Sequence, residues 1–297
     1  MPGERTERVT PVSERISPTV RWRKVARALR RWRSEAGLRL EDICAPLSWA
    51  TSKLSRMERA EQAIGPAEVI ALATIYGIGE QERDRYVALA LQSRQKGWWT
   101  TFNIWDTIPD EFEEFVGLES EASRMRSYED MVVPGLLQTA DYATALAHGW
   151  IPRVSDQAIS ERVRLRMARQ AQLHDDPQLQ LDSVLTEAAL HQQVGGPEVM
   201  RQQLQHLLVM NELPNVSVQV MPFAAGAYPA QNCPFRLLSF PDPEDPAVVR
   251  VEYPGGAVYV EEADDVEGFI LVFGELTQRA LDPSESAELI RELAVGG

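Results

Sequence analysis

Apolar side chains recur at helical spacing in five consecutive segments of the first hundred residues. The first segment, 20–36, places Val25, Leu29 and Trp32 on one face, and Gly37 is a natural stop after it. Four more helices are predicted at 40–47, 51–59, 65–77 and 79–93. The pattern therefore predicts an all-α bundle of five short helices.

The periodicity changes after residue 97. Residues 179–184 and 216–220 alternate as strands do, and an amphipathic helix at 197–212 separates them. These three segments predict a β-α-β crossover with parallel strands. Further strands are expected at 235–240, 248–253 and 257–260, and further helices at 110–124, 141–148, 155–173, 266–279 and 284–293. The second part is predicted to be an α+β domain with a mixed sheet.

These patterns divide the chain of 297 residues into three parts. Residues 1–18 contain three prolines among polar residues, and we expect them to form a disordered arm. Residues 19–95 hold the helical bundle, and residues 96–297 hold the α+β domain. The predicted fold class is therefore multidomain, in keeping with the length of the chain.

The net charge of -14 would argue against nucleic-acid binding, but the charges are unevenly distributed. Residues 1–60 contain 14 basic and 7 acidic side chains, a net of +7. The remaining residues contain 16 basic and 37 acidic side chains, a net of -21. Chance clustering is the plain alternative. We favour a basic module that faces nucleic acid, joined to an acidic domain with another task.

Composition also indicates where the protein resides. No apolar run is long enough to span a bilayer, and the N-terminal residues lack the apolar stretch of a signal peptide. Cys44 and Cys233 could form one disulfide. We favour the interpretation that both are free, buried thiols in a reducing cytoplasm. We therefore expect a cytoplasmic, nucleoid-associated protein without a membrane partner.

Residues 36–58 have the pattern of two helices that meet at a tight turn. Ile43 holds the first helix to the core, Trp49 fills the turn, and Leu54 and Met57 anchor the second helix. The opposite face of the second helix then presents polar side chains to solvent. The predicted DNA-binding residues are Arg39, Thr51, Ser52, Lys53, Ser55, Arg56 and Arg59.

These residue types suit contact with double-stranded DNA. Short hydroxyl side chains near the start of the second helix let the backbone approach a groove closely. Arg56, one turn further on, could reach guanine O6 and N7 in a bidentate fork. Lys53 and Arg59 suit phosphates at the groove wall.

The segment resembles the helix-turn-helix of XRE-type regulators, which are related to phage repressors, over residues 20–92. The resemblance implies binding to an operator in double-stranded DNA. Among the positions that depart from the usual pattern are two at the turn. Trp49 stands where a small or polar residue is common in the turn, and Ala50 cannot cap the second helix.

Four segments of the second part resemble the large C-terminal domain of WhiJ-like regulators from spore-forming, antibiotic-producing bacteria. They are Gly97-Trp98-Trp99, the Phe-Val-Gly-Leu-Glu-Ser-Glu-Ala segment at 115–122, the Val-Pro-Gly-Leu-Leu-Gln-Thr segment at 133–139, and residues 218–223. The resemblance covers residues 97–295. It implies a regulator of development or secondary metabolism, often encoded beside a small acidic partner protein, and it implies no ligand or chemistry.

The second part lacks the motifs of common enzyme classes. Its four histidines, His148, His174, His191 and His206, stand at no metal-ligand spacing. A nucleophile elbow, a phosphate-binding loop and a His-Glu-x-x-His sequence are also missing. The acidic run at 261–265 suits a solvated helix start better than a cation site. We therefore expect no catalytic residue, metal or cofactor, and an enzyme is the second choice.

Two clusters leave alternatives open. The first cluster consists of Trp98, Trp99 and Trp105, and it could line a ligand pocket. Trp98 and Trp99 are therefore weak ligand-binding candidates. We favour the alternative that these rings bury the seam between the domains. The second cluster is a basic stripe on one side of the predicted helix 155–173, and it consists of Arg162, Arg166 and Arg169. The stripe is either an exposed helix face or a surface that binds an acidic partner protein.

Together these observations predict a cytoplasmic transcriptional regulator. We expect a homodimer, because one recognition helix reads too few base pairs for useful specificity. The second domain is larger than dimerisation needs, which suggests that it also reads a signal or a partner. The alternative is an antitoxin-like interaction protein that holds a small acidic partner and regulates its own expression.

Overall fold

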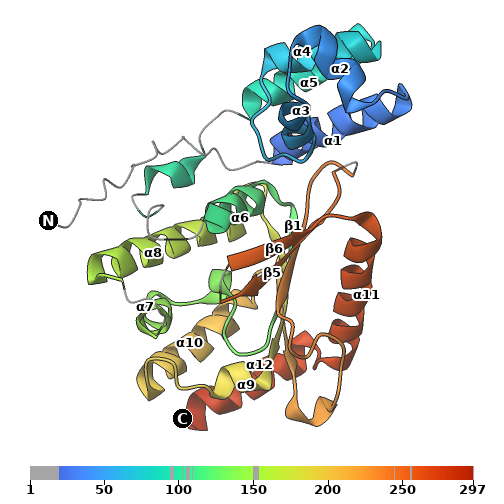
Figure 1. Cartoon of the computed structure of the whole chain (residues 1–297). Coiled ribbons are helices and arrows are strands. Elements are labelled where there is room, and N and C mark those ends of the chain that lie inside the picture. The colour runs from blue at the N-terminus through green and yellow to red at the C-terminus, as the bar shows by residue number, and fades with distance from the viewer. Residues whose placement is uncertain are drawn as a thin grey trace, which may run out of the picture. The chain divides into compact units, whose positions relative to one another are not determined.

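The computed structural model describes residues 20–93, 97–102, 104, 108, 110–149, 154–243, 245–254 and 256–296. The chain divides into two compact units at the bond between Gln95 and Lys96 (Figure 1). The predicted arm at 1–18 lies outside the described residues. In the described part, no helix is long and apolar enough to cross a membrane.

The first unit is the predicted bundle of five helices. Its helices are α1 (Val20–Glu35), α2 (Leu40–Leu47), α3 (Thr51–Glu58), α4 (Pro66–Tyr76) and α5 (Glu80–Gln92). Two helices end in the left-handed conformation: α4 at Gly77, with φ +71°, and α2 at Ser48, with φ +53°. Glycine adopts that conformation without strain, whereas serine does so at a cost.

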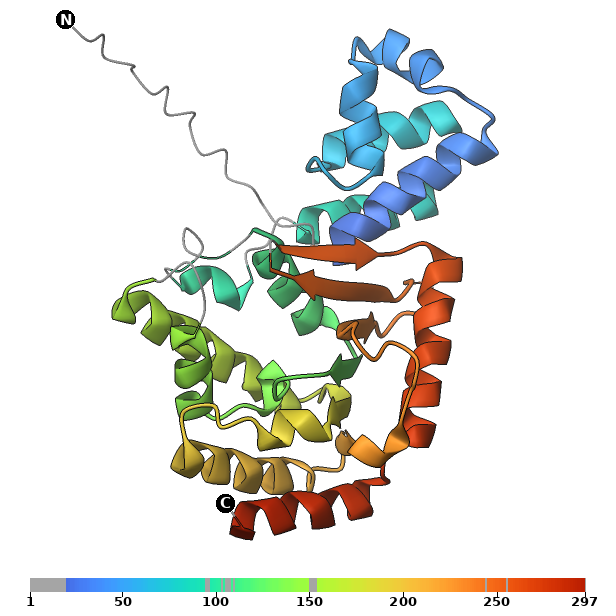
Figure 2. The same cartoon turned by 60° about the horizontal axis from the view of Figure 1, so that its bottom comes forward.

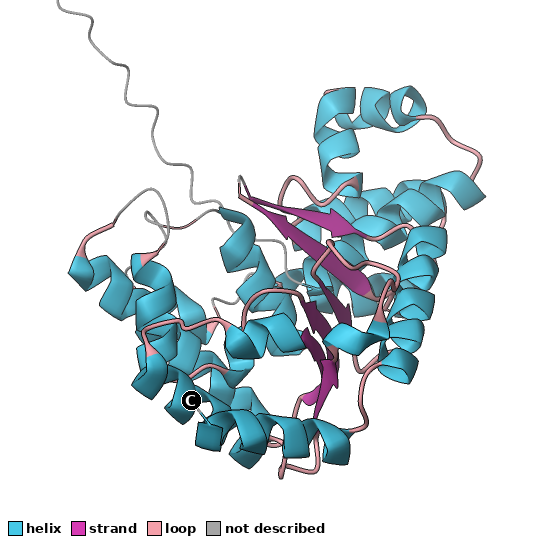
Figure 3. Ribbon diagram, turned by 90° about the horizontal axis from the view of Figure 1, so that it is seen from below, coloured by secondary structure: helices cyan, strands magenta, loops and turns pink. Residues whose placement is uncertain are grey.

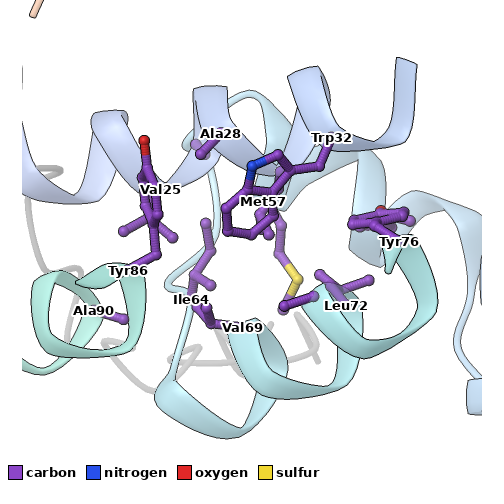
Figure 4. Packing of buried hydrophobic residues seen from close by; sticks show 14 of the residues in the cluster. Val25, Ala28, Trp32, Met57, Ile64, Val69, Leu72, Tyr76, Tyr86 and Ala90 are labelled. Atoms are coloured by element: carbon purple, nitrogen blue, oxygen red, sulfur yellow. The ribbon is translucent and has the colours of Figure 1, made fainter. Parts of the chain in front are cut away.

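A single apolar core joins the five helices (Figure 4). The Trp32 ring from α1 meets the Tyr86 ring of α5 edge to face, with 4.9 Å between centroids. The indole Nε1 of Trp32 donates to Glu82 Oε1 at 2.9 Å, so the buried ring keeps a hydrogen bond. Met57 reaches the same core from α3 and is fully buried. The orientation of α3 is therefore set by the packing of its inner face.

The second unit is the predicted α+β domain. Its sheet is formed by β1 (Arg124–Glu129), β2 (Gln180–Thr186), β3 (Val216–Met221), β4 (Phe235–Ser239), β5 (Val248–Tyr253) and β6 (Gly256–Val260). The strand order is β3-β2-β1-β4-β5-β6. Strands β1, β2 and β3 run parallel, and β4 to β6 join them antiparallel. The expected parallel crossover is the connection from β2 to β3. Because parallel and antiparallel pairs occur in the same sheet, the predicted mixed sheet is confirmed.

Helices cover both faces of this sheet (Figures 2 and 3). They are α6 (Asp110–Glu121), α7 (Ala140–His148), α8 (Asp156–Arg169), α9 (Glu187–His191), α10 (Pro197–Met210), α11 (Ala263–Arg279) and α12 (Pro283–Gly296). Short 3-10 turns occur at η1 (Trp98–Thr101), η3 (Gly135–Leu137), η4 (Gln170–Leu173) and η5 (Phe223–Ala225). On one face, Tyr128, Val184 and Leu237 form an apolar core with Phe273 and Leu276 of α11.

Strand β1 corrects the expectation of a helix as far as residue 124. Helix α6 ends at Glu121, and β1 begins at Arg124. The strand contains Arg126, Ser127 and Glu129, so it lacks the apolar alternation from which strands are predicted. Ser127 and Glu129 are nevertheless buried in the domain. A buried polar strand cannot be recognised from periodicity alone.

The cysteines also differ in part from the expectation. Cys44 and Cys233 are both free thiols, but only Cys44 is buried and Cys233 is half-buried. Burial raises the pKa of the Cys44 thiol. Its sulfur lies 3.8 Å from the carbonyl oxygen of Ala50.

Candidate nucleic-acid interface

Helices α2 and α3 meet at the tight turn that the sequence predicts. The backbone of Ser48 turns left-handed after α2, and the Trp49 N–H donates to the Cys44 carbonyl at 3.0 Å. Helix α3 then begins at Thr51. Ala50, at its N-cap, is extended and supplies no side-chain cap, as the sequence predicts. The start of α3 is held by the turn and by core packing.

The inner and outer faces of α3 separate as predicted. Leu54 and Met57 are fully buried in the core. Of the predicted DNA-binding residues, Thr51, Ser52, Arg56, Arg59 and Arg39 are exposed, and Lys53 and Ser55 are half-buried. Arg39 stands at the N-cap of α2 and Arg59 directly after α3. The α3 residues thus form one polar surface.

Acidic neighbours that sequence reasoning missed hold two of the basic side chains. Lys53 Nζ lies 3.5 Å from Glu68 Oε1 and 4.0 Å from the centroid of the Trp49 ring. Arg59 donates from Nε and Nη2 to both oxygens of Glu61, each at 2.8 Å. That bonding raises the pKa of Arg59 and lowers the pKa of Glu61. Phosphate contacts by Lys53 or Arg59 would therefore compete with these ion pairs, of which the Lys53 pair is half-buried and the Arg59 pair is exposed and therefore weak.

Arg56 differs from those two residues. Its Nε donates to the neutral side-chain oxygen of Gln62 at 3.2 Å. No ion pair joins Arg56 or Arg39 to a carboxylate within the described residues. A guanidinium with an exchangeable neutral partner can turn towards a base edge at little cost, so Arg56 is the side chain best prepared for base contact.

A partly buried ion pair fixes the end of α3 against α1, and sequence reasoning missed it. Arg33 donates from Nε and Nη2 to the two carboxylate oxygens of Glu58 at 2.7 and 2.8 Å. Its Nη1 also donates to the Leu38 carbonyl at 3.2 Å, which ties down the chain before α2. These bonds raise the pKa of Arg33. The pair orients α3, and a helical pattern gives no signal for it.

Comparison with known families agrees with this geometry. Residues 24–86 match a family described as a helix-turn-helix domain. Residues 112–292, more than half of the chain, match the domain of unknown function DUF5753. The chain belongs to the DUF5753 family. Comparisons with curated proteins and with solved structures gave no match.

The tryptophans at the start of the second unit lie in different environments. Trp99 is 7% exposed and packs with Ile104, Val116 and Leu165. Trp98 is 43% exposed and lines a hollow of about 390 Å³ together with Glu119 and other residues of the DUF5753 domain. Of the two weak ligand-binding candidates, Trp98 lines this hollow, whereas Trp99 is buried in an apolar cluster. Trp105 lies outside the described residues.

The predicted basic stripe on α8 is not a continuous surface, and this corrects the sequence analysis. Arg169 is 5% exposed and donates to both carboxylate oxygens of Glu119, at 2.8 and 2.7 Å. Arg166 is half-buried and donates to Gln138 Oε1, and Arg162 is also half-buried. Arg169 therefore cannot receive a partner protein, and the face of α8 that bears it is turned into the domain.

The remaining candidates for chemistry are dispersed. In the part of the chain that the structure describes, no group of three His, Cys, Asp or Glu side chains could hold a metal ion. His191 Nε2 lies 3.5 Å from Glu187 Oε1, and its ring stacks on Phe223 with 5.8 Å between centroids. The acidic run precedes and enters the first turn of α11, as a helix start would.

Proposed function

We propose that this chain is a sequence-specific, DNA-binding transcriptional regulator that acts as a homodimer in the cytoplasm. The observation that carries the proposal is helix α3, which is anchored by buried Leu54 and Met57 and has a polar outer face. The match to a helix-turn-helix domain supports it. Homodimerisation follows from specificity, because paired recognition helices read two half-sites.

The finer family assignment rests on motifs in the sequence. We propose an XRE-type regulator with a WhiJ-like second domain that reads a signal and is regulatory rather than catalytic. The alternative, an interaction protein that holds an acidic partner, depended on the basic stripe of α8. Burial of Arg169 removes one of its three residues, so we favour the regulator.

The roles of α3 can be separated by substitution. An operator is first selected by the full-length protein from random DNA duplexes, and affinity is then measured by fluorescence anisotropy at fixed salt. Arg56→Ala should cost about 1–3 kcal/mol of binding free energy and relax sequence preference at one position. Lys53→Ala should weaken binding to all duplexes and reduce the salt slope by about one.

Arg83→Ala is the matched control, because Arg83 lies on α5 and pairs there with Asp84 at 2.9 Å. It should leave operator affinity as it is in the unmodified protein. An Arg56→Ala protein that binds the selected operator with unchanged affinity and preference would refute the assignment of α3 as the recognition helix.

A further inference from the structure

A row of polar side chains crosses the middle of the DUF5753 sheet on the face that α6 covers. The strand registers place Ser183 beside Ser127 and Ser127 beside Arg236. Arg250 follows on the next strand, beside Arg236. Because residues paired across strands share a face, the four side chains lie side by side. Such covered positions are ordinarily apolar, since a buried polar group costs free energy unless it is hydrogen-bonded.

Carboxylates hold the two arginines of this row. Arg236 bonds to Glu129, and its Nη1 lies 2.9 Å from Glu252 Oε2. Arg250 also donates to Glu252. Both guanidiniums approach the ring of Phe115 on α6, with 5.6 Å from Arg236 and 4.6 Å from Arg250 to its centroid. The charges are thus packed between the sheet and α6.

Arg166 adds a positive charge that forms no ion pair with a carboxylate within the described residues. Among the described residues its hydrogen-bond partner is the neutral amide oxygen of Gln138. The amide nitrogen of Gln138 donates to the Val133 carbonyl at 2.6 Å, which fixes the amide so that its oxygen faces Arg166. Burial, and after it the charges of Arg169 and Arg236, lower the pKa of Arg166 to about 10. The charges of Glu252 and Glu129 raise this pKa, but they do not offset burial and the neighbouring guanidiniums.

The whole cluster therefore has an excess of positive charge. It consists of Arg166, Arg169, Arg236 and Arg250 with Glu119, Glu129 and Glu252. Among the side chains that the structure describes, four guanidiniums face three carboxylates in this cluster, and burial raises the pKa of one of these, Glu129, to about 7. A buried charge without a counter-charge is unfavourable. The domain would be stabilised by one further negative charge at this place.

Hydrogen-bond donors in the same row also lack acceptors. Within the described residues, Arg250 Nε and the hydroxyls of Ser127 and Ser183 are buried and have no hydrogen-bond partner. An orphaned buried polar group is uncommon in a native structure and indicates a missing partner. A carboxylate or phosphate offers several acceptor oxygens and the negative charge together. Arg166 is half-buried and the Glu252 side chain is 39% exposed, so one end of the cluster lies at the surface of the domain.

We propose that the DUF5753 domain binds a small molecule through an oxyanion group, a carboxylate or a phosphate, held by Arg166 next to Arg236 and Arg250. The proposal deepens the signal-reading part of the proposed function. The anion supplies the missing counter-charge and accepts from the unpartnered donors. Its binding would stabilise the folded domain in proportion to occupancy.

The test measures thermal unfolding of the full-length protein without DNA. Inorganic phosphate or acetate is added in series at an ionic strength held constant with sodium chloride. At least one anion should raise the melting temperature in a saturable manner, and the arm that responds distinguishes phosphate from carboxylate. Arg166→Met should weaken that binding by about tenfold or more, since hydrogen bonds to charged groups contribute that much. Arg164→Met, on the exposed side of the same helix, should respond as the unmodified protein does.

A second variant distinguishes loss of anion binding from loss of folding. Glu252→Gln removes a carboxylate that competes with the anion for Arg236 and Arg250, so it should bind the same anion more tightly than the unmodified protein. Damage to the fold cannot produce that gain. The proposal is overturned if neither anion gives a saturable shift, if Arg166→Met responds like Arg164→Met, or if Glu252→Gln fails to gain affinity. Because no DNA is present, failure of operator binding leaves this result unaffected.

Discussion

The ion pair between Glu119 and Arg169 offers the sharpest test of how the DUF5753 domain is held together. Glu119 is 1% exposed and Arg169 is 5% exposed, so neither charge is solvated. The carboxylate accepts from Arg169 at 2.8 and 2.7 Å and from Gln172 Nε2 at 2.9 Å. Glu119→Gln keeps the shape of the side chain but removes its charge and one acceptor. Arg169 is then left buried without a counter-charge.

The expected loss is large because the arginine stays in place. Removing one partner of a buried pair costs about 3–5 kcal/mol, whereas an exposed pair contributes about 1 kcal/mol or less. A domain is ordinarily stable by about 5–15 kcal/mol, so Glu119→Gln should remove a large share of the free energy of unfolding. Replacing both residues with apolar ones, Glu119→Leu with Arg169→Met, should cost less than Glu119→Gln alone, because no buried charge remains.

Native-state hydrogen exchange is the suitable assay, because the chain has two units that need not unfold together. Amides of β1 and β2 report the opening of the second unit. Glu161→Gln is the control, since Glu161 pairs with Arg164 on the same α8 but that arginine is 65% exposed. If Glu119→Gln lowers the free energy of opening no more than Glu161→Gln does, the argument from burial is refuted.

Three further predictions concern stability. Met57→Ala empties a fully buried site and should cost the first unit about 2–5 kcal/mol in urea unfolding; a loss below about 1 kcal/mol would contradict the packing. Ala50→Ser supplies the missing cap of α3 and should stabilise by about 0.5–2 kcal/mol, seen as a higher melting temperature; no rise would show that the turn already satisfies the helix start. Burial lowers the pKa of His206, so the unfolded chain binds more protons and the free energy of unfolding should fall as pH drops below about 6.5. His206→Gln should flatten that pH dependence, and an unchanged pH profile would remove His206 as its cause.

The helical first unit could be predicted from its sequence because its apolar side chains follow helical spacing throughout. Val25, Leu29 and Trp32 recur at helical spacing and all reach the core. Gly77 ends α4 in the left-handed conformation that it alone adopts without strain. Local propensity, burial and turn chemistry agree in this unit, which is the condition under which a sequence specifies its fold.

The sheet was harder to predict where polar residues are buried. Strands β3 and β5 follow the apolar pattern and were predicted within one residue of their bounds. Strand β1 was missed because its Ser127 and Glu129 face the charged cluster instead of an apolar layer. Their partners stand far away in the sequence: Arg236 bonds to Glu129 across 107 residues. Periodicity describes a segment by itself, so it cannot show a partner supplied by another strand.

The same limit explains the wrong interpretation of α8, and correcting it moves the signal-reading site that we propose. Spacing placed its arginines on one side of a helix but could not show which way that side faces. The segments 115–122 and 133–139 supply the answer, because Glu119 belongs to the first and Gln138 to the second, and both bond to α8 arginines. Arginines on an outward face of α8 would suit an acidic partner protein. Arginines that face inward and outnumber their carboxylate partners suit a small anion. An effector bound there would act on the packing between α6, α8 and the sheet. It would shift the domain from one conformation to another only to the extent that it binds the two conformations with different affinities.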